Sequence, residues 1–276
     1  MSEGKIRVAL GGSEGKMGKV MQRLITEAPD METVARYDNI HSGGLTHETP
    51  PLLGSDGEPL LGFIGEHFAR ARPDVYVDFS QPDAVVHNVT QACEKGADCV
   101  IGTTGWYKEL EVVRDAAKSN GRRIVYASNF SPGVNAMYAA TELLAKTLGK
   151  IGWDGAVFEA HHVQKKDAPS GTAAQLGKIL VDNIPRKERV SGTRTEGRSP
   201  EVVDIAPARV GSVVGHHQVH LAPGMETGYT ERLIVMHDAY NRDVFGSGAR
   251  IAVRWVYGSK DKEPGLYAFG HDVLGF

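Results

Sequence analysis

The chain has 276 residues, enough for one large domain or two of moderate size. Hydrophobic residues make up 41% of it and charged residues 24%, as in ordinary globular proteins. The formal net charge of -3 excludes a general attraction to nucleic acid or to a membrane surface, so we expect neither as a partner. No run approaches the roughly 18 apolar residues of a membrane span.

Cysteine usage and the amino terminus bear on the compartment. Cys93 and Cys99 are too few for a disulfide framework and do not form a C-x-x-C motif, so we expect reduced thiols. The first apolar run is short and leads directly into Gly11 and Gly12, unlike a secretory signal. The sequence therefore predicts a cytoplasmic protein.

The first half of the chain alternates short apolar runs with longer amphipathic ones. The short runs predict strands at Ile6–Leu10, Thr33–Tyr37, Val75–Asp78, Asp98–Ile101 and Arg123–Tyr126. The longer runs predict helices at Lys16–Ala28, Pro59–Arg70, Pro82–Lys95 and Tyr107–Ser119, and the composition of Asn39–Gly57 predicts a surface loop. Strands that alternate with helices indicate βαβ units, so we expect an α/β, Rossmann-like parallel sheet.

The pattern changes after Phe130. It predicts a helix at Val134–Gly149, a strand at Gly155–Val163, a helix that begins near Ser170 and a polar loop around Arg186–Pro200. Alternation then predicts antiparallel strands at Ile205–Val210, Val213–Leu221 and Thr230–His237, before a last helix at about Asp243–Tyr257 and a short tail. We expect a first domain at residues 1–130, on which residues 241–276 pack back, and a second, α+β domain at residues 131–240.

A glycine motif follows the first predicted strand. Gly12, Gly15 and Gly18 form G-x-x-G-x-x-G, a variant of the dinucleotide fingerprint, in which glycines allow a tight turn and a close approach of backbone amides to a pyrophosphate. Glu14 stands where a second glycine is commoner, so its side chain must point away from the phosphates. A turn whose glycines serve only packing is the structural alternative.

Other candidate nucleotide contacts lie at later strand ends. Asp38 ends the second strand about twenty residues after Gly18, where a carboxylate accepts hydrogen bonds from ribose and favours NADH over NADPH, although nearby Arg36 can temper that preference. Ile101–Gly105 and Ala127–Ser131 end two further strands at the edge where α/β sheets bind ligands. Thr and Asn there suit ribose and carboxamide contacts, and Phe130 is placed to face the nicotinamide ring.

The segment Glu159–Ala173 carries the densest group of reactive side chains. Two histidines and two lysines end a strand, and Pro169 and Ser170 open a helix whose first amides, at Gly171 and Thr172, suit a carboxylate. Lysine and histidine supply positive charge and a transferable proton. The histidine pair also suggests a zinc site, but no further ligands accompany it at a familiar spacing, so we expect no metal.

The run EAHHVQKKDAPSGTA resembles the signature of the dihydrodipicolinate reductase family. The resemblance extends over nearly the whole chain, through GSEGKMG at 12–18, DFSQP at 78–82, GTTGW at 102–106, SNFSPGVN at 128–135 and later RVGSVVGHH and NRDVFGSGA. It implies an NAD(P)H-dependent reductase of 4-hydroxy-tetrahydrodipicolinate in diaminopimelate and lysine biosynthesis. It also implies a homotetramer with a Rossmann domain and a domain for substrate binding and tetramerisation.

Residue roles follow from the same resemblance. It implies that His161 is catalytic, that Lys165 donates a proton, and that His162, Gly171 and Thr172 bind the dicarboxylate substrate. The implied cofactor contacts are Gly12, Ser13, Glu14, Gly15, Lys16, Met17, Asp38, Gly102, Thr103, Thr104, Ala127, Ser128, Asn129 and Phe130. The chain departs from the family where His216 replaces a glutamate and where Asn241 replaces a serine.

The residues leave several readings open. We expect hydride transfer to the ring and proton donation by Lys165 with His161 as relay, although the sequence does not divide these two roles. The alternatives are a paralogue that reduces another cyclic imine or keto acid, a non-catalytic nucleotide sensor and a metal-dependent hydrolase.

Overall fold

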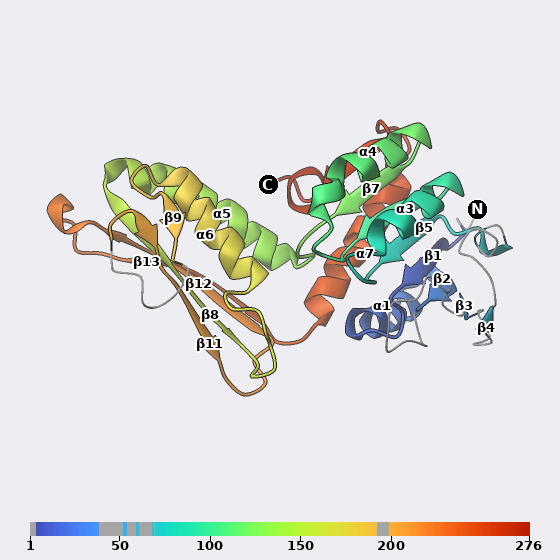
Figure 1. The fold of residues 1–276 in the computed structure, drawn as a ribbon, viewed down its shortest axis with the longest axis horizontal. Helices are drawn as coiled ribbons and strands as arrows, with labels where there is room; N and C mark the ends of the chain where they lie inside the picture. Colours follow the sequence, from blue (N-terminus) through green and yellow to red (C-terminus); the bar gives the residue numbers. More distant parts are fainter. Residues whose placement is uncertain (1–3, 39–51, 54–58, 61–67, 69, 192–198) are drawn as a thin grey trace. The chain divides into compact units, whose positions relative to one another are not determined.

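The computed structural model describes residues 4–38, 52–53, 59–60, 68, 70–191 and 199–276. The chain forms two compact units, one of Met1–Ser131 with Asp243–Gly275 and one of Pro132–Arg242 with the terminal Phe276 (Figure 1). None of the helices in the described ranges is long and apolar enough to span a lipid bilayer.

An eight-stranded sheet forms the first unit, in the order β14-β7-β6-β5-β1-β2-β3-β4. Its strands are β1 (Ile6–Gly11), β2 (Met31–Tyr37), β3 (Leu52–Leu53), β4 (Pro59–Leu60), β5 (Val75–Asp78), β6 (Asp98–Ile101), β7 (Arg123–Tyr126) and β14 (Gly265–Ala268). All pairs from β14 to β2 are parallel, which confirms the Rossmann-like sheet. Because β1 lies between β2 and β5, the carboxyl ends of these three strands border the crevice where α/β proteins bind ligands.

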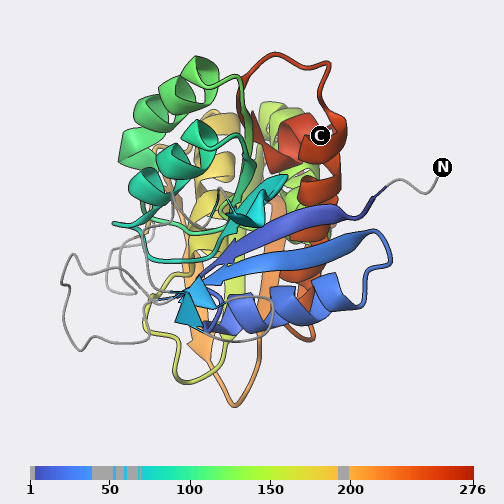
Figure 2. The same ribbon diagram turned by 90° about the vertical axis from the view of Figure 1, so that its right-hand side faces the viewer.

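Helices cover both faces of this sheet (Figure 2). Helices α1 (Lys16–Thr26) and α7 (Asp243–Gly258) pack on one face, and α3 (Val85–Glu94) and α4 (Leu110–Ser119) pack on the other. The strands between them are apolar on both sides, as a sheet covered on both faces requires. Cys93 and Cys99 are buried and not joined in a disulfide, with their Sγ atoms 4.0 Å apart in a thiol hydrogen bond.

Two local predictions for this unit are wrong. The range Pro59–Arg70 does not begin as a helix, since Pro59–Leu60 is strand β4 and pairs with Leu52–Leu53 in the expected loop. Phe68 and Arg70 are helical, and most of the rest of this range and of Asn39–Gly57 lies outside the described residues. The expected tail instead contains β14, which extends the sheet beside β7. These two-to-four-residue strands depend on pairing with a partner, so local patterning does not reveal them.

The second unit places two helices on a four-stranded sheet (Figure 1). Helices α5 (Pro132–Leu148) and α6 (Gly171–Asn183) pack on one face of a sheet in the order β11-β8-β12-β13. The strands are β8 (Trp153–His161), β11 (Ile205–Arg209), β12 (Gly215–Pro223) and β13 (Leu233–Ala239). A two-stranded sheet, β9 (Arg189–Val190) and β10 (Val202–Val203), lies within and after the expected polar loop.

The expected antiparallel arrangement of this unit is wrong for one strand. Strand β11 pairs parallel with β8, whereas β12 pairs antiparallel with both β8 and β13. The sheet is therefore mixed, because the alternation of side chains sets the buried face of a strand but not its direction.

The buried face of β8 changes character along the strand. Trp153, Gly155 and Val157 contribute to the core beneath α5 and α6, and the same alternation then brings Glu159 and His161 onto this face, both buried. Because charged residues are rarely buried without a partner, this end of the sheet is the candidate functional site of the second unit.

Candidate active site

The glycine turn between β1 and α1 is fixed by close backbone packing. Gly12 has φ +70°, and a Cβ on it would lie 2.1 Å from the Phe79 carbonyl oxygen. A Cβ on Gly18 would lie 2.1 Å from the Gly12 oxygen, whereas one on Gly15 would meet nothing closer than 3.2 Å. Gly12 and Gly18 are therefore required by geometry, while Gly15 has more freedom.

The amino terminus of α1 suits an anion. Its N-cap is Gly15, and no side chain caps the first amides of the helix. The Glu14 side chain is exposed and lies 3.7 Å from Lys19 Nζ, one turn into the helix. Free amides and the helix dipole together attract phosphate groups.

Asp38 lies directly beside this turn. The Glu14 amide donates to Asp38 Oδ2 at 2.5 Å, which ties the end of β2 to the glycine motif. Arg36 donates instead to Gln22 Oε1 at 3.0 Å, and Gln22 donates to the Ser13 carbonyl at 2.6 Å. The Asp38 carboxylate thus borders the glycine turn.

The strand-end residues expected to contact a cofactor differ in what they offer. Gly102 lies against the Phe79 ring, and Thr103 is buried with its hydroxyl donating to Asp78 Oδ1 at 2.6 Å, so that hydroxyl serves the fold. Thr104 and Ser128 are exposed, and Ala127 and Asn129 are half-buried.

Phe130 requires a correction. Its side chain is only 2% exposed and packs on Phe269 with ring centroids 4.9 Å apart, while its carbonyl lies against Gly248 of α7. The ring belongs to the core of the first unit rather than facing outward to a nicotinamide. Only the backbone of Phe130 remains as a candidate contact.

Sequence reasoning assigned no role to Asp78, which is fully buried at the end of β5. Its carboxylate accepts from the hydroxyls of Tyr76, Ser80 and Thr103 at 2.6–2.8 Å, and from the amide of Asn88 at 3.3 Å. These bonds join the loops after β5 and β6, which both lie at the ligand-binding edge. The D-F-S-Q-P string marked the segment but not this connection.

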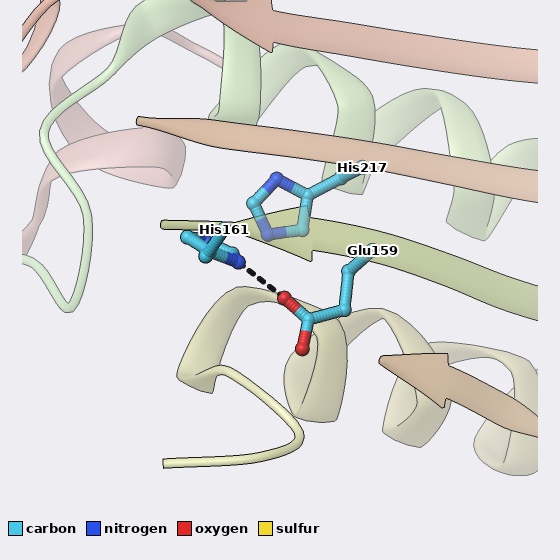
Figure 3. Close-up of side chains that lie close together, drawn as sticks. All are labelled: Glu159, His161 and His217. Carbon is cyan, nitrogen blue, oxygen red and sulfur yellow. Dashed lines mark ion pairs between the residues drawn. The ribbon is translucent and has the colours of Figure 1, made fainter. Parts of the chain in front are cut away.

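In the second unit, Glu159, His161 and His217 converge (Figure 3). Glu159 and His161 point to one face of β8 because they are two residues apart, and His217 of β12 pairs in register with Glu159. The Glu159 carboxylate is paired with His161 Nδ1, and the His161 and His217 rings lie 5.1 Å apart. The structure thus gives His161 a buried carboxylate on one ring nitrogen, the arrangement that orients an imidazole and fixes its tautomer.

The charges in this cluster are set by burial and by an arginine. Burial alone raises the pKa of Glu159, but hydrogen bonds from His161 and Arg209 outweigh it and lower the pKa to about 2. Burial, and then the charge of His161, lower the pKa of His217 to about 4. At neutral pH the site therefore contains an ionised carboxylate and a neutral His217.

Lys165 lies on the loop between β8 and α6. Its Nζ is 2.8 Å from Asp167 Oδ1 and 2.9 Å from Asp167 Oδ2, and its side chain is 24% exposed. His162, also expected to contact substrate, directly follows β8 and is half-buried. The ammonium group of Lys165 is therefore held by an exposed carboxylate.

The amino terminus of α6 completes the group. Ser170 caps the helix by accepting from the Ala173 amide at 3.2 Å, its own amide donates to Glu159 Oε1 at 3.2 Å, and its hydroxyl lies 3.2 Å from His217 Nε2. Gly171 is exposed, and a Cβ there would meet no atom within 4 Å. The first turn of the helix is open beside the histidine cluster, as an anion site requires.

The same three side chains are of types that bind zinc. Glu159, His161 and His217 offer ligand atoms that all lie within 4.8 Å of one another. In the structure, Arg209 and the Ser170 amide hold one carboxylate oxygen, and His161 Nδ1 lies against the other. The positive charge beside the carboxylate is that of Arg209, 3.0 Å away.

His216, one of the departures noted in the sequence, is not part of this cluster. It points to the opposite face of the sheet, where its Nδ1 lies 2.6 Å from Asp238 Oδ1 on β13. The substitution is therefore accommodated by a hydrogen bond away from the histidine cluster.

Both halves of the chain match models of one family. Residues 6–130 match "Dihydrodipicolinate reductase, N-terminus", and residues 133–274 match "Dihydrodipicolinate reductase, C-terminus". The 4-hydroxy-tetrahydrodipicolinate reductase of Methanoculleus marisnigri is 36% identical over 270 residues, which cover 98% of this chain and 99% of the relative. That of Aquifex aeolicus is 35% identical over 284 residues, with 98% and 99% covered.

Solved structures agree. The dipicolinate-bound dihydrodipicolinate reductase of Paenisporosarcina sp. TG-14 is 28% identical, with a TM-score of 0.75 and coverage of 96% of this chain and 97% of that one. A diaminopimelate dehydrogenase of C. glutamicum shares the fold alone, at 13% identity and a TM-score of 0.54. The matches over both halves and over the full length show that the chain belongs to the dihydrodipicolinate reductase family.

Proposed function

We propose that this protein catalyses the NAD(P)H-dependent reduction of 4-hydroxy-tetrahydrodipicolinate to tetrahydrodipicolinate, a step of diaminopimelate and lysine biosynthesis. The observation that carries the proposal is the buried Glu159–His161 pair beside the open amino terminus of α6. It combines a proton-transferring group with a site for a carboxylate, the two requirements for reducing a ring that bears carboxylates.

The residues of the first unit fit a dinucleotide. Gly12 and Gly18 let the turn pack directly against the backbone of Phe79 and of the turn itself, and the uncapped amides of α1 lie at the same turn. We assign the pyrophosphate to Gly12–Met17, the adenosine ribose to Asp38 and the nicotinamide half to Gly102–Thr104 and the backbone of Ala127–Phe130. Bound NAD(P)H supplies the hydride.

The second unit supplies binding and proton transfer. One substrate carboxylate is bound by the amides of Gly171 and Thr172, and His162 and Lys165 add hydrogen bonds and positive charge. The hydroxylated substrate first loses water to give a dihydropyridine, whose C4 then accepts the hydride. Lys165 leaves Asp167 for the substrate and donates the proton to the neighbouring ring carbon. His161, held at Nδ1 by Glu159, presents Nε2 to the substrate and relays the proton.

The first experiment follows NADH and NADPH absorbance during reaction with freshly generated 4-hydroxy-tetrahydrodipicolinate. We expect oxidation that falls by roughly 100-fold or more in His161→Ala and in Lys165→Ala, since removal of a general acid or base costs 10²–10⁴-fold. The KM for the cofactor should stay unchanged in both variants. Full turnover in Lys165→Ala would contradict its role as donor, and cofactor binding without any turnover would favour a different cyclic imine or keto acid as substrate.

We infer a homotetramer, with the open face of the four-stranded sheet as the contact between subunits. Phe158, Ile234 and Met236 lie on that face with 40–58% of their surface exposed, and the Phe158 ring packs against His220 at 4.5 Å between centroids. Exposed apolar side chains clustered on a sheet face that no helix covers are typical of association surfaces. Sedimentation velocity tests the tetramer. The cytoplasmic location stays a prediction from the sequence.

A further inference from the structure

Arg209 contacts two parts of the candidate site at once. It ends β11, which pairs parallel with β8 so that Arg209 lies in register with His161. Its Nη1 donates to Glu159 Oε1 at 3.0 Å. Its Nε donates to the Lys165 carbonyl at 3.2 Å, and its Nη2 donates to the Asp167 carbonyl.

These bonds need the shape of a guanidinium group. One planar group donates in three directions, to a carboxylate and to two carbonyls of the loop between β8 and α6, which no lysine ammonium reproduces in the same rigid geometry. The side chain is only 19% exposed, so these bonds are partly shielded from water and stronger for it. Arg209 is linked to the N-cap of α6 only through Glu159, whose Oε1 also accepts from the Ser170 amide.

We propose that Arg209 is a positioning residue for proton transfer: it fixes the carboxylate that orients His161 and, with the same group, the loop that carries Lys165. The inference rests on the proposed function, because it assigns Arg209 to the reaction that His161 and Lys165 perform. Arg209 acts through these two residues and does not touch the reacting atoms.

The structure indicates what its loss would change. Without Arg209, the Glu159 carboxylate loses one of the hydrogen bonds that hold it, and the backbone at Lys165 and Asp167 loses two. Displacement of a reacting group by about 1 Å lowers turnover by roughly 100-fold. The cofactor residues belong to the other unit, so cofactor binding is spared.

The test compares Arg209→Ala with Arg186→Ala. Arg186 is a matched control, since it lies in the same unit and pairs with Asp154 at 3.3 Å and Glu226 at 3.2 Å, and no bond from it reaches Glu159 or the Lys165 loop. In Arg209→Ala we expect kcat to fall roughly 100-fold, as for a misplaced reacting group, with the KM for NADH unchanged. Arg186→Ala should retain the wild-type kcat.

Chemical rescue separates positioning from a general loss of structure. Millimolar guanidinium chloride, against sodium chloride at equal ionic strength, should raise kcat of Arg209→Ala and leave His161→Ala, Lys165→Ala and Arg186→Ala unchanged. Arg209→Lys keeps the positive charge but not the planar guanidinium group with its several donors, so its kcat should remain low. This variant also serves as the test if Arg209→Ala fails to fold.

The outcomes are distinguishable. If Arg209→Ala or Arg209→Lys turns over like the wild type while His161→Ala and Lys165→Ala are inactive, the role of Arg209 is wrong and the proposed function stands. A slow Arg209→Ala with a raised KM for NADH and no rescue also overturns positioning, because it indicates disruption of the whole protein. If His161→Ala and Lys165→Ala are fully active, the proposed function itself fails.

Discussion

The two ligand-binding regions of this molecule are built by different means. In the first unit the glycine turn depends on the absence of side chains. A Cβ on Gly12 or on Gly18 would lie only 2.1 Å from a backbone carbonyl oxygen. In the second unit the site consists of side chains, a buried carboxylate, two histidines and an arginine drawn from three strands. The first needs space and free amides, whereas the second needs charges that balance one another.

This difference determines how each region responds to change. A backbone site fails by steric overlap, which is indifferent to pH and cannot be relieved by a small rotation. A site made of buried ionisable groups fails when one partner is removed or titrated, because the remaining charge is left uncompensated. Substitutions in the glycine turn should therefore act by steric overlap at any pH, whereas the histidine cluster should respond to pH and to the loss of a charged partner.

The largest effect is expected for Gly18→Ala. The added methyl group would overlap the Gly12 and Ser13 backbone, and overpacking of this kind costs about 3 kcal/mol. Expressed in cofactor binding, that is a loss of roughly 100-fold in affinity for NADH, measurable by fluorescence titration. Gly258→Ala is the control, since a Cβ there meets nothing within 4 Å. Equal NADH affinity in both variants would show that the turn does not depend on close packing.

A pH effect between pH 7 and 4.5 is expected in the second unit. Burial lowers the pKa of His217 to about 4, so below pH 6.5 the unfolded chain takes up a proton more readily than the folded one. The contribution of neutral His217 to the free energy of unfolding is complete above pH 6.5 and is lost as pH falls towards 4. For a pKa shift of this size the contribution is about 3 kcal/mol. Hydrogen exchange of the β8 and β12 amides at pH 7 and 4.5 measures it.

A variant isolates this contribution from those of neighbouring groups. Burial also lowers the pKa of His220 and of His237, and these act in the same direction. His217→Gln should remove only the His217 share, so that protection of β8 and β12 falls less steeply with pH than in the wild type. An unchanged pH dependence would mean that His217 is not held neutral by its surroundings.

The smallest effect is expected at Asp38, a charged side chain that accepts a backbone hydrogen bond from the glycine turn. Its carboxylate receives the Glu14 amide and lies at the end of β2, so it should repel the 2′-phosphate of NADPH. Asp38→Asn should shift the ratio of kcat/KM for NADPH over NADH upward by roughly tenfold, equivalent to about 1.4 kcal/mol. Steady-state rates with both cofactors measure the ratio, and a shift towards NADH would exclude electrostatic selection by this residue.

Local sequence was sufficient for the features of the first unit that depend on neighbours along the chain. Alternating strands and helices determined the parallel sheet, and the spacing of Gly12, Gly15 and Gly18 determined the turn. The run from Glu159 to Thr172 likewise determined where reactive side chains gather, because a strand end and a helix start adjoin there within fourteen residues of sequence.

Tertiary structure alone decided which side chains meet. Arg209 and His217 come to Glu159 only because β11 and β12 pair with opposite sides of β8, one parallel and one antiparallel, and alternation does not specify strand direction. Phe130 is buried because α7, more than a hundred residues later, closes over it with Gly248, and Phe269 packs against its ring. Burial and pairing between distant segments set the charges and orientations of the site, and they depend on the whole fold rather than on any one stretch of sequence.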